Sequence, residues 1–168
     1  PYVTVNAYNL WALVTGDTGY SLASDGLWVC DGAWIASKCG SGVAMFGPVS
    51  ALAVGTALLL AVIGIIAAVI WRRPDRLTIL LGLTVLAFAF FAVPTRVHER
   101  YGFPFFALAI MLAAISWRWR IAYALATVTT FLNMYVVLTT LYTTNPGVED
   151  WLQIGSAIRS EVGVALIA

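Results

Sequence analysis

The sequence predicts an all-α membrane protein with about four transmembrane helices. Of its 168 residues, 61% are hydrophobic and only 10% are charged, whereas an average soluble domain has about 25% charged residues. The apolar residues form long runs separated by short, arginine-rich turns. A helix needs about 20 consecutive apolar residues to cross the hydrocarbon core of a bilayer, and these runs approach or reach that length. We therefore expect a multi-pass integral membrane protein.

Residues 1–47 are predicted to form an interfacial segment and an extracytoplasmic loop. The apolar stretch 2–14 is too short to cross a bilayer upright, and its aromatic residues suit the headgroup level. The glycine-rich loop that follows holds Cys30 and Cys39. We expect a local disulfide between them on the oxidising side of the membrane. Two free thiols are the alternative.

Residues 48–141 are predicted to form the transmembrane region. Its four apolar runs cover 48–71, 77–93, 105–117 and 121–141. Pro94 is expected to end the second helix because proline lacks the amide that would continue the hydrogen-bond ladder. Residues 142–168 are expected to be an extracytoplasmic tail, with an amphipathic interfacial helix over 148–167.

The arginines predict the orientation. The turns 72–76 and 118–120 carry five of the nine basic residues and one acid, and short cytoplasmic turns are enriched in Lys and Arg. With four spans, the N-terminal loop, the 94–104 loop and the tail then share the outer side. The cell compartment that fits is the bacterial inner membrane.

The segment 94–104 is the candidate site. It places Arg96, His98, Glu99 and Arg100 between two apolar runs, and ionisable residues at a membrane are costly to keep. The arginine fork suits a phosphate group, and histidine adds a hydrogen bond or a titratable charge. Glu99 could bind a substrate hydroxyl. The alternative is structural: basic side chains that reach lipid headgroups and a His-Glu pair that only pins the loop.

Several other classes of function find no support. A formal charge of +1 gives no basic surface for nucleic acid. The single histidine and two cysteines make no metal site, since zinc takes four ligands or three plus water. No cofactor motif and no catalytic nucleophile are predicted. Asn133 is expected to bond between helices, and the tryptophans at 71, 117 and 119 to lie at the membrane interface.

Three segments resemble polytopic glycosyltransferases of the GT-C type. Residues 95–104, TRVHERYGFP, are similar to the "H-E-R-Y-x-F-P" segment of family 39-like proteins and of mannosyltransferases of the GPI-anchor type. Residues 5–11, VNAYNLW, resemble an upstream "N-x-x-N-L-W" segment. Residues 131–135, FLNMY, resemble a downstream "F-L-N-x-Y" segment. The order and rough spacing match over about residues 1–142.

The resemblance implies sugar transfer from a polyprenyl-phosphate donor at the outer face. Arg96, His98 and Arg100 would then contact the donor phosphate, while Glu99 and Tyr101 would shape the pocket. Such enzymes carry their catalytic acid in a first outer loop near the N-terminus, followed by many spans. The loop acids at 17, 25 and 31 do not match that pattern, so the resemblance implies a C-terminal, donor-binding portion without the catalytic residue.

Two functions follow as expectations. One is a transmembrane module that binds the lipid phosphate of a glycosyl donor. The other is a non-catalytic accessory subunit of a larger membrane complex, for example a photosynthetic or respiratory one. The expected partners are therefore membrane lipid, a polyprenyl-phosphate sugar, and other membrane protein chains or the missing N-terminal part of a parent protein.

Overall fold

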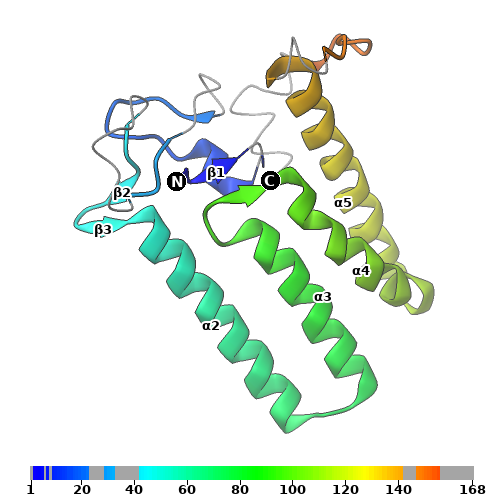
Figure 1. Ribbon diagram of the computed structural model, residues 1–168. Helices are drawn as coiled ribbons and strands as arrows, with labels where there is room; N and C mark the ends of the chain where they lie inside the picture. Colours follow the sequence, from blue (N-terminus) through cyan, green and yellow to red (C-terminus); the bar gives the residue numbers. More distant parts are fainter. Residues whose placement is uncertain are drawn as a thin grey trace.

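The computed structural model shows four α-helices with short strands and turns gathered at one end (Figure 1). It describes residues 2–5, 7, 9–22, 29–32, 42–141 and 147–155. The helices are α2 (Ala51–Arg72), α3 (Arg76–Ala92), α4 (Phe103–Ile115) and α5 (Trp117–Val136), and α5 continues into the π-helical turn η4 (Val137–Leu141). The short elements are β1 (Thr4–Val5), η1 (Leu10–Leu13), β2 (Met45–Phe46), β3 (Val49–Ser50), β4 (Val97–His98) and η3 (Glu99–Gly102).

All four predicted apolar helices are present. Two of them, α2 and the stretch Trp117–Thr140, are long and apolar enough to cross a membrane. Helix α3 is apolar but has 17 residues, and α4 has 13. The number of membrane crossings therefore stays a prediction.

Helices that follow one another in the chain pack side by side: α2 with α3, α3 with α4, and α4 with α5 (Figure 1). Their connections define a turn end, where residues 73–75 join α2 to α3 and Ser116 joins α4 to α5. The opposite, loop end holds the N-terminal residues, β4, η3 and residues 147–155. The charged segment, residues 94–104, thus lies at the other end of the molecule from both arginine-rich turns. The predicted orientation in a membrane requires this arrangement and itself stays a prediction.

Helices α2 and α3 approach closely at Gly82. A Cβ atom at this position would lie 3.0 Å from side-chain atoms of both Ile66 and Ile70. Such a distance is tighter than ordinary packing, so only glycine fits without moving the isoleucines. Small residues of this kind let transmembrane helices approach when no hydrophobic effect drives them together.

Most buried residues lie at the loop end and not between the helices. One cluster joins Val3, Trp11, Val29, Ala44 and Ala51. By contrast, only 6% of the apolar window of α2 and 22% of that of Trp117–Thr140 is buried. The helices therefore present their apolar surfaces outward, as expected of helices that face lipid.

The N-terminal segment caps the C-terminal end of α3. Pro94 ends that helix and leaves its last carbonyl groups without helical partners. The Asn9 side chain donates to the carbonyl of Phe91 at 2.9 Å, and Trp11 Nε1 donates to the carbonyl of Val93 at 2.7 Å. Trp11, expected at the headgroup level, is 7% exposed. Its ring is buried because its N–H donates to a carbonyl group at the C-terminal end of α3.

The all-α prediction is incomplete because two small sheets form at the loop end. Strand β1 pairs parallel with β4, with Thr4 opposite Val97, and β2 pairs antiparallel with β3. These strands have two residues each, too short to give a periodic pattern in the sequence. They form because the segments that connect to the helix ends need hydrogen-bond partners for their backbone N–H and C=O groups.

Two predictions fall partly outside the described residues. Cys30 is described and buried, but Cys39 is not, so the predicted disulfide stays a prediction. Of the predicted amphipathic helix 148–167, residues 148–155 are described, and 151–152 form a turn.

The described tail docks on the end of α5. Tyr135 donates its hydroxyl hydrogen to Asp150 Oδ1 and accepts a hydrogen bond from the amide of Leu152 at 2.7 Å. The Asp150 carboxylate also accepts from the amides of Ile154 and Gly155, at 3.2 and 2.9 Å. The ring of Trp151 meets that of Tyr135 edge-on, 5.5 Å between centroids.

We expect Asp150→Asn to lower the apparent Tm near pH 7 and to lower it less near pH 3. The hydrogen bond from Tyr135 holds the pKa of Asp150 below its ordinary value of 3.8. The stabilisation is therefore present above that pH and is lost as the pH falls through the lower pKa of the folded state. Thermal unfolding in detergent at both pH values measures the effect. Glu149→Gln is the matched control, and an equal loss of Tm at both pH values would contradict the assignment.

Candidate functional site

The charged segment enters the loop end as part of a small sheet. The amide of Arg96 donates to the carbonyl of Val3 at 3.1 Å, and Val97 and His98 then form β4 beside β1. Val97 is 2% exposed and anchors the segment. The five residues named by the sequence thus follow one another along a short strand and the turn η3, and each has a different environment.

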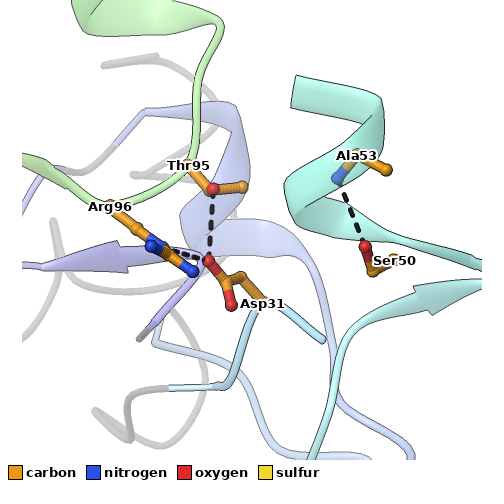
Figure 2. Close-up of polar contacts among 5 residues, drawn as sticks. All are labelled: Asp31, Ser50, Ala53, Thr95 and Arg96. Carbon is orange, nitrogen blue, oxygen red and sulfur yellow. Dashed lines mark hydrogen bonds and ion pairs between the residues drawn. The ribbon is translucent and has the colours of Figure 1, made fainter. Parts of the chain in front are cut away.

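Arg96 is bound to Asp31, 65 residues earlier in the chain (Figure 2). Its Nε donates to Asp31 Oδ2 at 2.6 Å, and the hydroxyl of Thr95 donates to the same oxygen at 3.4 Å. Asp31 is fully buried, while the Arg96 side chain is 45% exposed. The backbone carbonyl of Asp31 also accepts from the amide of Leu52 in the first turn of α2. Through its carboxylate and its backbone carbonyl, Asp31 therefore joins its own segment to the segment after α3 and to the start of α2.

The backbone of Arg96 has φ = 66°. This left-handed conformation costs about 1–2 kcal/mol for a residue with a Cβ atom. The amide bond to Val3 and the ion pair to Asp31 offset that cost. The sequence predicts Arg96 as a phosphate ligand, and its two terminal nitrogens make no hydrogen bond to the described residues. Its Nε, however, is committed to Asp31.

His98 and Tyr101 face each other across the start of η3. Their rings meet edge-on at 5.6 Å, and Tyr101 also contacts Phe90 at 6.1 Å. His98 is half-buried and Tyr101 is 37% exposed. Both rings are therefore partly exposed at the loop end, where η3 packs against α3.

Glu99 and Arg100 make no ion pair with the residues that the structure describes. Glu99 Oε2 is buried and accepts no hydrogen bond within the part of the chain that the structure describes. Arg100 is exposed, and the ion pair of Arg96 is the one found among the described residues. An orphaned buried oxygen costs about 1–3 kcal/mol, so a ligand that donates to Glu99 would recover that energy.

An apolar groove of about 510 Å³ lies beside the segment, between α3, α4 and α5. Asn9, Leu10 and Gly102 border it at the loop end, and Gly102 directly follows Arg100 and Tyr101 in the chain. The other lining residues are Val85, Phe88, Phe91, Ala92, Phe105, Phe106, Trp119, Ala122, Leu125, Ala126, Thr129 and Thr130. Since a helix rises 1.5 Å per residue, the groove follows α5 for about 16 Å, from Trp119 to Thr130.

The volume and lining suit a long apolar chain. Ligand sites in proteins measure about 300–1,000 Å³ and are mostly apolar with a few polar groups. Here Asn9 lies at the loop end of the groove, next to the charged segment at Gly102, and mainly aromatic and aliphatic side chains, with Thr129 and Thr130, line the rest. An amphiphile with an anionic head near Arg100 and a tail along α5 would match both parts. No group of three or more His, Cys, Asp or Glu side chains among the described residues could hold a metal ion.

Comparisons with known proteins find no match: no protein-family model, no curated protein and no solved structure is similar to this chain. The glycosyltransferase resemblance of the three short segments therefore stays a hypothesis.

Two features of this site could not be predicted from the sequence. The Asp31–Arg96 pair joins residues 65 positions apart, and no local spacing signals such a contact. The groove is lined mainly by apolar residues of three helices. In the sequence, none of these residues differs from an ordinary lipid-facing residue. Asn9, noted only as part of a short motif, lies at the groove and caps α3.

We expect Asp31→Asn to lower the apparent Tm by about 4–8 °C, because it leaves Arg96 without its charged partner at a strained backbone position. This corresponds to a loss of about 2 kcal/mol, reduced from the cost of breaking a fully buried pair because Arg96 is half exposed. In the Asp31→Asn background, Arg96→Gly should be more stable than Arg96→Ala, since glycine adopts positive φ freely. Equal stability of those two double variants would contradict the strain argument.

Proposed function

We propose that this chain binds the phosphate and lipid chain of a polyprenyl-phosphate sugar and serves a membrane glycosyltransferase. The observation that carries the proposal is the apolar groove that reaches the charged segment at Gly102. A polyprenyl phosphate has the same division, an anionic head and a long apolar tail. The resemblance of residues 95–104 to glycosyltransferases of the GT-C type supports the same ligand.

In this proposal Arg100 is the main phosphate ligand. It is exposed and makes no ion pair with the described residues. It lies two positions before Gly102, which lines the groove. The terminal nitrogens of Arg96 and the ring of His98 add hydrogen bonds. Glu99 Oε2, buried without a donor, accepts from a sugar hydroxyl, and Tyr101 borders the head group. The chain supplies binding and not the catalytic acid.

The proposed setting is a multi-pass protein of the bacterial inner membrane. The two arginine-rich turns then face the cytoplasm, and the charged segment lies at the outer headgroup level. Arginines outside run against the usual distribution, which favours a ligand for them. The pairing of Arg96 with Asp31 lowers the net charge of this end, so Arg100 remains as the residue that most needs an anionic partner.

We expect Arg100→Ala to weaken binding of a polyprenyl phosphate about 10- to 100-fold, because a charge-assisted hydrogen bond is worth about 1.5–3 kcal/mol. Binding is measured on the purified protein in neutral detergent by native mass spectrometry. Arg100→Lys keeps the charge and should lose less. Arg96→Ala is unsuitable as the main test because it also breaks the Asp31 pair. Unchanged binding by Arg100→Ala would remove the site.

We expect Ala126→Phe to weaken binding of a long-chain polyprenyl phosphate by about tenfold, equivalent to about 1.4 kcal/mol. Ala126 lines the groove, and a phenyl ring there occupies space that the tail would fill. Ala124→Phe is the matched control, since Ala124 is exposed on the same helix and does not line the groove. Equal effects of the two variants would show that the tail binds elsewhere.

A second candidate function is an accessory subunit of a larger membrane complex. Helix α2 favours it, because its face away from α3 is a continuous exposed row of small residues: Ala53, Ala57, Ala61, Gly64 and Ala68. Nothing lies within 4 Å of a Cβ built at Gly64, and such rows suit close helix packing in membranes. Extraction in mild detergent as an 18.1 kDa monomer, with no partner chains, would contradict this function.

A further inference from the structure

We infer that the turn end is a binding surface for anionic phospholipid headgroups. This surface is formed by the two connections α2–α3 and α4–α5, on the opposite end of the molecule from the charged segment (Figure 1). It is independent of the proposed glycosyl-donor site, because neither the residues nor the face is shared.

The turn end carries an uncompensated positive charge. Five arginines and one aspartate lie there, which gives a formal charge of +4: Arg72, Arg73, Arg76, Arg118, Arg120 and Asp75. All five arginines are exposed, and none forms an ion pair within the part of the chain that the structure describes. Within each turn the arginines lie at most four residues apart in the chain, and like charges repel one another, so an anionic partner would stabilise them.

The single acid of this surface is committed to the backbone. Asp75 Oδ1 accepts from the amides of Leu77 and Thr78, both at 3.0 Å, and Oδ2 accepts from the Thr78 hydroxyl at 2.6 Å. These bonds cap the start of α3 and hold the pKa of Asp75 below its ordinary value. Its carboxylate therefore serves the helix end and makes no ion pair with the arginines beside it.

The two turns differ in how many guanidinium groups they offer. Arg120 folds back on α4, where its Nε donates to the carbonyl of Ala113 at 2.9 Å and its Nη2 donates to that of Ala114 at 3.4 Å. At the α2–α3 turn, Arg72, Arg73 and Arg76 make no side-chain hydrogen bond to the described residues. That turn is therefore the stronger part of the surface.

Tryptophans place this surface at the depth of lipid headgroups. Trp71 is 89% exposed directly before Arg72, and Trp117 is 65% exposed directly before Arg118. Tryptophan is enriched at the membrane interface, where its ring is apolar and its N–H is solvated. Clusters of basic residues directly after a transmembrane helix attract anionic lipids. The occupant that fits both observations is a phospholipid with a net negative headgroup.

The test uses the full chain in nanodiscs of phosphatidylcholine and phosphatidylglycerol, followed by native mass spectrometry of the lipids that stay bound. We expect the wild-type protein to retain phosphatidylglycerol over phosphatidylcholine. In the triple variant R72Q/R73Q/R76Q, the ratio of retained phosphatidylglycerol to phosphatidylcholine should fall about fivefold for each arginine removed. The variant R72K/R73K/R76K should keep most of the wild-type ratio. Rising salt should weaken the preference, because exposed charges are screened.

Wild-type retention of the two lipids in equal amounts would overturn the inference, and so would an unchanged preference in the glutamine variant. Circular dichroism checks that this variant folds, which is expected because all three positions are exposed. Inorganic phosphate distinguishes the source of the anion. If millimolar phosphate displaces phosphatidylglycerol completely at constant ionic strength, the surface binds free anions and not lipid.

Discussion

The loop end depends on one buried carboxylate. Asp31 has no exposed surface, and its side chain accepts from Arg96 and Thr95 while its carbonyl accepts from Leu52. These contacts join the N-terminal region, the start of α2 and the segment after α3. A buried carboxylate is costly unless it is paired and hydrogen-bonded, so this arrangement tolerates few alternatives. It also explains why Arg96 adopts a backbone conformation that arginine normally avoids.

This constraint divides the charged segment into two parts. Residues up to Val97 belong to the framework, since Thr95 and Val97 are buried and Arg96 is paired. His98 ends the strand β4, and Glu99–Gly102 form the turn η3 that leads to α4 and to the apolar groove. A firmly held strand is thus followed by a turn whose two charged residues, Glu99 and Arg100, make no ion pair with the described residues. Within the framework part, the ion pair with Asp31 accounts for the arginine at position 96.

The buried core lies at the loop end and not between the helices. The helices pack as neighbours but bury little of their apolar surface, and the tight clusters lie where the polar loops meet. In water this would be unstable, because exposed apolar surface is unfavourable. In a bilayer the same surface is solvated by lipid, and association depends on close contacts such as Gly82 against Ile66 and Ile70. The contacts at the loop end hold the helix ends in place.

The four helices, their order and their approximate limits could be predicted from the sequence, because apolar runs, Pro94 and the arginine-rich turns are local signals. The placement of the charged segment at the end opposite those turns followed from the same pattern, since each helix reverses the direction of the chain. The Asp31–Arg96 pair, the capping of α3 by Asn9 and Trp11, and the groove could not be predicted. Each joins residues from distant parts of the chain, and only the folded structure decides which polar groups meet when the helix ends must satisfy their hydrogen bonds.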